Sequence, residues 1–344
     1  MKSIGKMYDL LVEWILAHKK IVIPVAAVIL IILPKVISSN YVIRVLCLIG
    51  IYSILTMSLN LITGYMGQSS MGHAALYCMG AYFSALLGSK LGWPFWVTLP
   101  IGILGGALGG LILGISTMRL SAGYLTVITL AFGEVVRMVV LNWNSVTNGA
   151  LGVRSIPRPN LFGWELTPAN GGFYWLMLVL VLIAVLVCRN VVNSKFGRAV
   201  RAIKDDELAA KLMGVNTAKY RVQTIVLSGA LAGMAGAYYA SLNRFIDANT
   251  FSFDISMTIL SIVIFGGLGS IPGMFIGSAI LISFPEVLRF LADYRFVVYG
   301  LLLILMMRFR PQGLLGGPSR RPYDLPKGVK RPEADAANGR EQVG

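Results

Sequence analysis

Charged residues are scarce in this sequence. Only 13% of its 344 residues are Asp, Glu, Lys or Arg, about half the roughly 25% that is usual in soluble domains. Apolar residues make up 56% of the chain, and they gather in repeated runs of about 20 residues, the length that an α-helix needs to cross a bilayer. The composition excludes a soluble enzyme and predicts an all-α, polytopic integral membrane protein.

Residues that bind metals or form disulfides are also few. The chain has three cysteines and two histidines. Cys47, Cys78 and Cys188 lie far apart, each within an apolar run, and none belongs to a Cys-x-x-Cys pair. This pattern indicates neither a disulfide framework nor a metal site, and we expect no cofactor.

Motifs for catalysis are missing from the sequence. It contains no G-x-x-x-x-G-K-[ST] phosphate loop, no H-E-x-x-H zinc motif and no G-x-S-x-G nucleophile motif. No pair of carboxylates occurs within an apolar run. A membrane-integral enzyme is therefore disfavoured. We expect no catalytic residues, and any ATP hydrolysis that the function needs must take place on another chain.

Ten apolar segments are candidates for membrane spans. They are Ile21–Ile37, Val42–Thr63, Ala74–Ser89, Pro94–Met118, Gly123–Leu141, Phe173–Val192, Val222–Leu242, Ile255–Leu268, Gly273–Leu291 and Phe296–Arg308. We expect residues 1–308 to form a single transmembrane domain. We expect residues 309–344 to form a cytoplasmic, disordered tail, because Pro318–Gly344 is polar, basic and poor in apolar residues.

The distribution of basic residues predicts the orientation of these spans. The chain has 30 Lys and Arg against 15 Asp and Glu, a formal charge of +15. With both termini in the cytoplasm, more than two thirds of the Lys and Arg residues fall on cytoplasmic segments, as the positive-inside rule requires. The longest outside loop is then Asn142–Gly172. The topology accounts for the net charge, so no nucleic-acid partner is expected.

The segment Asn193–Arg221 is a long charged stretch on the predicted cytoplasmic side. Apolar side chains at 196, 199, 200 and 203 recur at helical spacing, with basic side chains at 198, 201 and 204 on the other side. The acidic run 205–207 suits the start of a second short helix, and Gly214 suits the position after its end. Two amphipathic helices of this kind fit a groove on a partner protein. An ordinary interfacial loop has the same pattern, so both interpretations stay open.

Glycine and polar residues interrupt the apolar pattern after the second predicted span. The stretch Gly64–His73 contains three glycines and several amide or hydroxyl groups. Irregular backbone at membrane depth is tolerated only where it is buried in protein or lines a wet cavity. Candidates for a substrate path are therefore Gln68, Ser69, Gly72 and His73, although the same residues could simply satisfy backbone groups at a helix break. A second break is predicted at Gly266–Gly273, and the short span before it is compatible with a half-helix.

Two opposite charges lie within the fifth predicted span. Glu134 and Arg137 are three residues apart, on one face of a helix. Charged residues inside a membrane are costly unless they face protein or water, and they often mark a transport path. Both are therefore candidate path residues. A local ion pair that neutralises the two charges is the alternative.

The sequence resembles the permease subunits of branched-chain amino acid ABC importers, the LivH/LivM family, and among them the LivM type. The similarity extends from about Val42 to Gly316. It is carried by the motifs Gly67–Ala75, Gly80–Tyr82, Gly197–Gly214, Ser228–Gly236, Gly266–Gly273 and Arg310–Leu314.

The resemblance implies a subunit of a bacterial inner-membrane importer for leucine, isoleucine and valine. Its implied partners are a LivH-like second permease, two ABC ATPase subunits and a periplasmic substrate-binding protein. It also implies that the cytoplasmic segment contacts the ATPase through Phe196, Gly197, Arg198, Arg201, Ala202, Ile203, Asp205, Asp206, Glu207, Ala209, Ala210 and Gly214. Similar permeases import urea and short amides, which is the nearest alternative. A secondary transporter or channel is a more distant one, because it would need its own coupling site and no ATPase dock.

Overall fold

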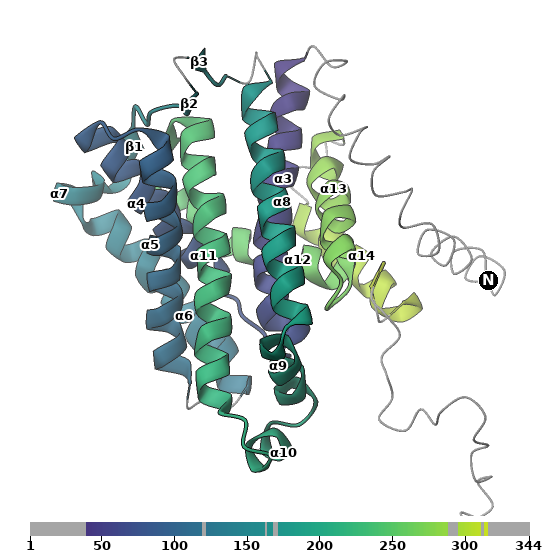
Figure 1. The fold of residues 1–344 in the computed structure, drawn as a ribbon. Helices are drawn as coiled ribbons and strands as arrows, with labels where there is room; N and C mark the ends of the chain where they lie inside the picture. The colour runs from purple at the N-terminus through teal and green to yellow at the C-terminus, as the bar shows by residue number, and fades with distance from the viewer. Residues whose placement is uncertain are drawn as a thin grey trace, which may run out of the picture.

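The structure is a computed structural model that describes residues 39–118, 122–161, 164–167, 171–287, 295–310 and 313–315. The predicted first span, Ile21–Ile37, and most of the predicted tail lie outside these ranges. The described part is a bundle of helices packed side by side (Figure 1). The prediction of a mainly helical membrane protein is therefore confirmed for these residues.

Nine helices of the bundle correspond to nine of the predicted spans within the described ranges. They are α3 (Asn40–Asn60), α4 (His73–Leu91), α5 (Phe95–Thr117), α6 (Ala122–Asn142), α8 (Gly172–Asn193), α11 (Thr217–Asn243), α12 (Phe253–Gly266), α13 (Ile271–Val287) and α14 (Arg295–Phe309). Among the described residues, six helical segments are long and apolar enough to cross a membrane: Asn40–Tyr65, Phe95–Thr117, Gly123–Asn142, Gly172–Asn193, Thr217–Asn243 and Ala248–Gly266. The total of about ten spans remains a prediction.

Close backbone contact joins α5 to α11, the most buried of the candidate spans within the described ranges. A methyl group on Gly229 would lie 2.3 Å from the carbonyl oxygen of Gly106, and one on Gly233 would lie 2.4 Å from that of Gly102. Neither space admits a side chain. Small residues at these positions let the two helices approach more closely than larger ones would allow, the usual basis of helix association in membranes.

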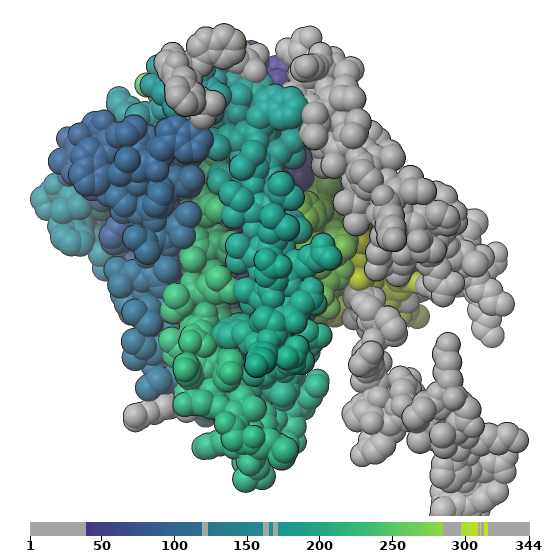
Figure 2. Space-filling view, in the orientation of Figure 1, coloured from purple at the N-terminus to yellow at the C-terminus, as the bar shows by residue number. Residues whose placement is uncertain are grey.

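The bundle has two different ends. The short helices α9 (Lys195–Asp205) and α10 (Glu207–Leu212) lie at one end, which we call the α9–α10 end. At the other end, the strand end, β1 (Val153–Arg154) pairs antiparallel with β4 (Phe245–Ile246). The remaining short elements of the strand end and its neighbourhood are α7 (Asn144–Thr147), η2 (Gly149–Leu151), β2 (Asn160–Leu161), β3 (Trp164–Glu165) and η3 (Ala248–Phe251). In the space-filling view the α9–α10 end projects beyond the neighbouring helices (Figure 2).

Both predicted breaks in the helical pattern are confirmed. The helix α3 continues as the π-helical turn η1 (Leu61–Tyr65), and non-helical backbone follows at residues 66–72, which we call the break segment. The helix α12 ends at Gly266, and Gly267 and Gly269 adopt φ angles of 107° and 79° before α13. The side-chain oxygen of Asn60 accepts a hydrogen bond from the backbone N–H of Gly269 at 2.8 Å, so the two breaks lie against each other.

Candidate functional site

The two short helices are bounded by side-chain and backbone caps. At the start of α9, the hydroxyl of Ser194 accepts from the backbone N–H of Gly197 at 3.4 Å. At the start of α10, the carboxylate of Asp206 accepts from the N–H of Ala209 at 2.9 Å. These caps satisfy N–H groups that a helix cannot satisfy itself. The prediction of two short helices in this segment is therefore confirmed.

The end of α10 depends on a left-handed glycine. Gly214 has a φ of +83°, and its N–H donates to the carbonyl of Lys211 at 3.1 Å. The next N–H, that of Val215, donates to the carbonyl of Ala210 at 3.0 Å. This pair of bonds is the Schellman arrangement that closes a helix, as the position of Gly214 in the sequence indicates.

The apolar face of α9 packs against its own chain. Gly197, Val200 and Ile203 are buried, and Val200 packs in a cluster with residues of η1, α5 and α11. The ring of Phe196 lies 5.4 Å from that of Tyr220, centre to centre. The expectation that this face binds a partner groove is wrong for α9, because the bundle already covers it.

The exposed apolar surface at this end belongs to α10 instead. Leu208, Leu212 and Met213 are 68%, 80% and 84% exposed, and we call them the α10 patch. Sequence analysis did not single them out. The signal was present, since Leu208 and Leu212 stand four residues apart in a helix of charged and small residues.

The residues implied as ATPase contacts divide by exposure. The exposed ones are Arg198, Arg201, Ala202, Asp205, Asp206, Glu207, Ala209 and Gly214. Phe196 is half-buried, and Gly197, Ile203 and Ala210 are buried. The buried residues pack the two short helices against the bundle. Only the exposed residues are accessible for direct contact with another chain.

Gln68 lies at the α9–α10 end, where it contacts a buried arginine. Its side chain is 4% exposed. With its amide oxygen toward Arg221, it accepts hydrogen bonds from Nε and Nη2 of that guanidinium at 2.8 Å each. The same Nη2 donates to both carboxylate oxygens of Glu207, at 2.8 and 2.9 Å. Sequence analysis placed Gln68 and Glu207 in separate sites, and the structure joins them through Arg221.

A lysine of α9 reaches the residues just before the break segment. Nζ of Lys204 donates to the carbonyl of Gly64 at 2.6 Å. Gly67 lies against the stem of the same side chain, because a methyl group on it would be 2.8 Å from Cγ of Lys204. The helix α9 therefore contacts the region where α3 loses its regular form, whereas α10 is joined to it through Arg221 of α11.

The rest of the break segment packs on α6. The hydroxyl of Thr126 donates to the carbonyl of Ser69 at 3.3 Å, and the N–H of Met71 donates to the hydroxyl of Thr129 at 3.0 Å. A methyl group on Gly72 would lie 1.9 Å from the carbonyl oxygen of Thr129. Hydroxyl groups of α6 thus satisfy backbone groups that a helix would otherwise pair.

His73 begins α4 and is fully buried. Its Nε2 lies 2.6 Å from the hydroxyl of Ser58 on α3. The hydroxyl of Ser228 on α11 donates to the carbonyl of Ser58 at 2.7 Å, and the N–H after His73 donates to the hydroxyl of Ser256 on α12 at 2.9 Å. In this conformation His73 joins helices in the interior of the bundle.

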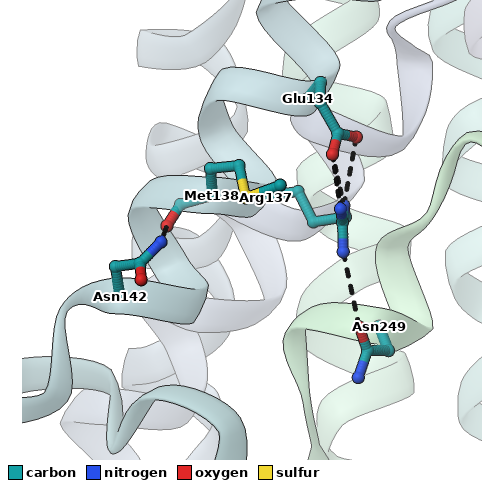
Figure 3. A network of polar contacts seen from close by, with 5 residues as sticks. All are labelled: Glu134, Arg137, Met138, Asn142 and Asn249. Atoms are coloured by element: carbon teal, nitrogen blue, oxygen red, sulfur yellow. Dashed lines mark hydrogen bonds and ion pairs between the residues drawn. The ribbon is translucent and has the colours of Figure 1, made fainter.

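The charged residues of α6 form the predicted ion pair (Figure 3). Nε of Arg137 donates to the two carboxylate oxygens of Glu134 at 3.1 and 3.0 Å, and Nη2 also donates to the carboxylate. Nη1 donates to the side-chain oxygen of Asn249 in η3 at 3.4 Å. The side chains of Arg137 and Glu134 are 20% and 44% exposed, so the pair lies at the surface of this single chain.

No metal site is formed within the described ranges. They contain no group of three or more His, Cys, Asp or Glu side chains that could hold a metal ion. The three cysteines are free and buried.

Comparison with known proteins identifies one family. Residues 41–307 match the family described as "Branched-chain amino acid transport system / permease component". LivM of Escherichia coli (strain K12), a high-affinity branched-chain amino acid transport system permease protein, is 35% identical over 294 residues, covering 79% of this chain and 69% of LivM. LivH of Salmonella typhimurium, from a transport system of the same description, is 27% identical over 295 residues, covering 78% of this chain and 92% of LivH. No solved structure matches the chain.

Proposed function

Because the chain belongs to the permease components of branched-chain amino acid transport systems, we propose that it forms half of the membrane path of an ATP-driven, high-affinity importer for leucine, isoleucine and valine. The observation that carries this proposal is the match over residues 41–307 together with the 35% identity to LivM. In this proposal the chain is not catalytic, and ATP hydrolysis takes place on two partner ATPase subunits.

The α10 patch supports an ATPase dock at the α9–α10 end. Three large apolar side chains project there next to exposed charged residues of both short helices. Apolar groups that cluster at an exposed projection mark protein interaction sites, and their burial on a partner supplies binding energy. The capped, compact form of α10 holds these side chains in a fixed arrangement, which lowers the entropy cost of binding.

The exposed charges of α6 support a location for the substrate path. Glu134 is eight residues from the nearer end of its helix, roughly 12 Å at a rise of 1.5 Å per residue. A half-exposed carboxylate at that depth is costly against lipid. In the middle of α8, by contrast, the exposed residues between positions 179 and 186 are all apolar, namely Val179, Leu182, Ile183 and Leu186, and its exposed polar residues lie in the last turns before α9. We therefore place the second, LivH-like permease and the path on the α6 side, and lipid on the α8 side.

The path candidates of the break segment differ in how they fit this location. Ser69 is half-buried and contacts α6, so it lies near the proposed path. Gly72 allows the break segment to approach α6 closely. Gln68 and His73 are engaged in the interior of the bundle. A path that opens beside α6 would be lined by Glu134, Arg137 and Ser69, with Gln68 and His73 behind them.

The two ends of the bundle support one orientation in the bacterial inner membrane. We place the α9–α10 end and both termini in the cytoplasm, and the strand end in the periplasm, where a substrate-binding protein delivers the amino acid. The basic residues of the segment 193–221 lie on the proposed cytoplasmic side, as the positive-inside rule requires.

Uptake by a purified complex tests the proposed function. The chain is co-expressed with the permease, ATPase and binding-protein reading frames encoded beside it, and the complex is reconstituted in proteoliposomes. We expect ATP-dependent uptake of labelled leucine that unlabelled isoleucine and valine suppress and urea does not. A complex with an inactive ATPase serves as the control. Uptake of leucine without ATP would support a secondary transporter, and uptake of urea in its place would overturn the substrate assignment.

A further inference from the structure

Arg221 is the largest fully buried side chain among the described residues, with 2% exposure. Burial of a guanidinium is costly unless charge and hydrogen-bond partners surround it. This one contacts the carboxylate of Glu207 at the first residue of α10, the amide of Gln68 in the break segment, and the carbonyl of Met118 after α5, the last at 3.2 Å. One side chain therefore links three separate segments at the α9–α10 end.

The two side-chain acceptors, Glu207 and Gln68, differ in how firmly they are held. Glu207 belongs to an exposed short helix, and its side chain is 48% exposed. Gln68 is buried in a segment that lacks the regular hydrogen bonds of the helices on either side of it. The guanidinium is planar and rigid, so it cannot follow a displaced carboxylate without changing its geometry toward the amide.

The break segment also contacts the proposed path. Beyond Gln68, the backbone of Ser69 and Met71 bonds to the hydroxyls of Thr126 and Thr129 on α6. Glu134 lies further along the same helix. Hydrogen bonds thus join α10 through Arg221 to Gln68, and other hydrogen bonds join the following residues of the break segment to α6, so the backbone of the break segment connects the two sets.

We propose that Arg221 is the positioning residue that transmits movement of α10 to the break segment and to α6, and so couples ATP hydrolysis on a partner to the opening of the path. This inference rests on the proposed function. When α10 moves with its ATPase, Glu207 draws the guanidinium and Gln68 must follow or lose its partner, which is unfavourable for a buried amide. Lys204 gives α9 a second contact to the same region, through the carbonyl of Gly64.

Uptake per hydrolysed ATP separates coupling from simple support of the fold. The complex is purified with its binding protein and reconstituted, and leucine uptake and phosphate release are measured on the same vesicles. We expect Glu207→Gln and Gln68→Leu each to lower the ratio at least about fivefold, the lower range of coupling between linked sites. Because both remove one linkage, the double variant should lower the ratio no further than the stronger single variant.

Two further variants keep the test decisive. Gln68→Glu retains an acceptor toward Arg221 and should restore the ratio that Gln68→Leu loses. Lys219→Gln removes an exposed basic side chain two residues before Arg221, and we expect its ratio to equal that of the unchanged complex. A normal ratio in both Glu207→Gln and Gln68→Leu would overturn the proposal, and so would additive losses in the double variant. Absence of uptake in the unchanged complex would instead contradict the proposed function.

Discussion

At the scale of single residues, the ion pair of α6 offsets the free-energy cost of placing two charged side chains within a membrane span. The guanidinium of Arg137 contacts Glu134 through two nitrogens and also reaches Asn249. In water such a pair would contribute little. Within a membrane span each of the two charges is stabilised mainly by the other, because a lone charge at that depth has no good alternative partner.

Substitution of Glu134 tests that dependence. Glu134→Gln leaves the charge of Arg137 without its carboxylate, and we expect a clear loss of folded complex, measured as the yield of monodisperse protein on size-exclusion chromatography. The double variant Glu134→Gln/Arg137→Gln removes both charges and should recover part of that yield. A double variant no better than the single one would show that the pair does not act as a unit.

At the scale of elements, the ends of the short helices were predictable because caps are local. Asp206 caps the start of α10 with its carboxylate, and Gly214 after its end takes the left-handed conformation that the lack of a Cβ permits. The glycines of Gly64–His73 and Gly266–Gly273 indicated breaks for the same reason. Each of these features is decided by residues within a few positions of one another.

Contacts between distant segments were not predictable from the sequence. The periodicity of α9 shows an apolar face, but only the packed bundle shows that η1, α8 and α11 cover it. Arg221 looks like one more basic residue of a cytoplasmic loop, and its burial beside Gln68 depends on how α11 and the break segment meet. The same holds for the bond between His73 and Ser58.

Gly214 offers a test of α10 as a defined element. A Cβ atom there would meet no atom of this chain within 4 Å, so its substitution changes the backbone conformation without disturbing packing inside the bundle. Gly214→Val should cost about 1–2 kcal/mol in the left-handed conformation and reduce co-purification of the ATPase. Gly214→Asn, which tolerates that conformation, is the matched control and should co-purify normally. Equal co-purification of both variants would argue against a role for the shape of α10 in docking.

At the scale of the whole molecule, the proposed function requires the two ends of the bundle to face opposite compartments. The α10 patch lies at one end, and β1 with its neighbours lies at the other. Leu212 and Leu151 are both large, apolar and exposed, at 80% and 72%, so they provide comparable probes of the two ends. The natural cysteines are buried, which keeps their background reactivity low.

Cysteine probes at these two positions test whether the α9–α10 end is the cytoplasmic dock for an ATPase. We expect Leu212→Cys to form a cross-link with the ATPase subunit in isolated membranes, and to resist a membrane-impermeant maleimide added to intact cells. Leu151→Cys should react with that maleimide and form no cross-link. Labelling of Leu212→Cys from outside the cell, or a cross-link of the ATPase to Leu151→Cys, would contradict the assignment of the α9–α10 end as the cytoplasmic dock.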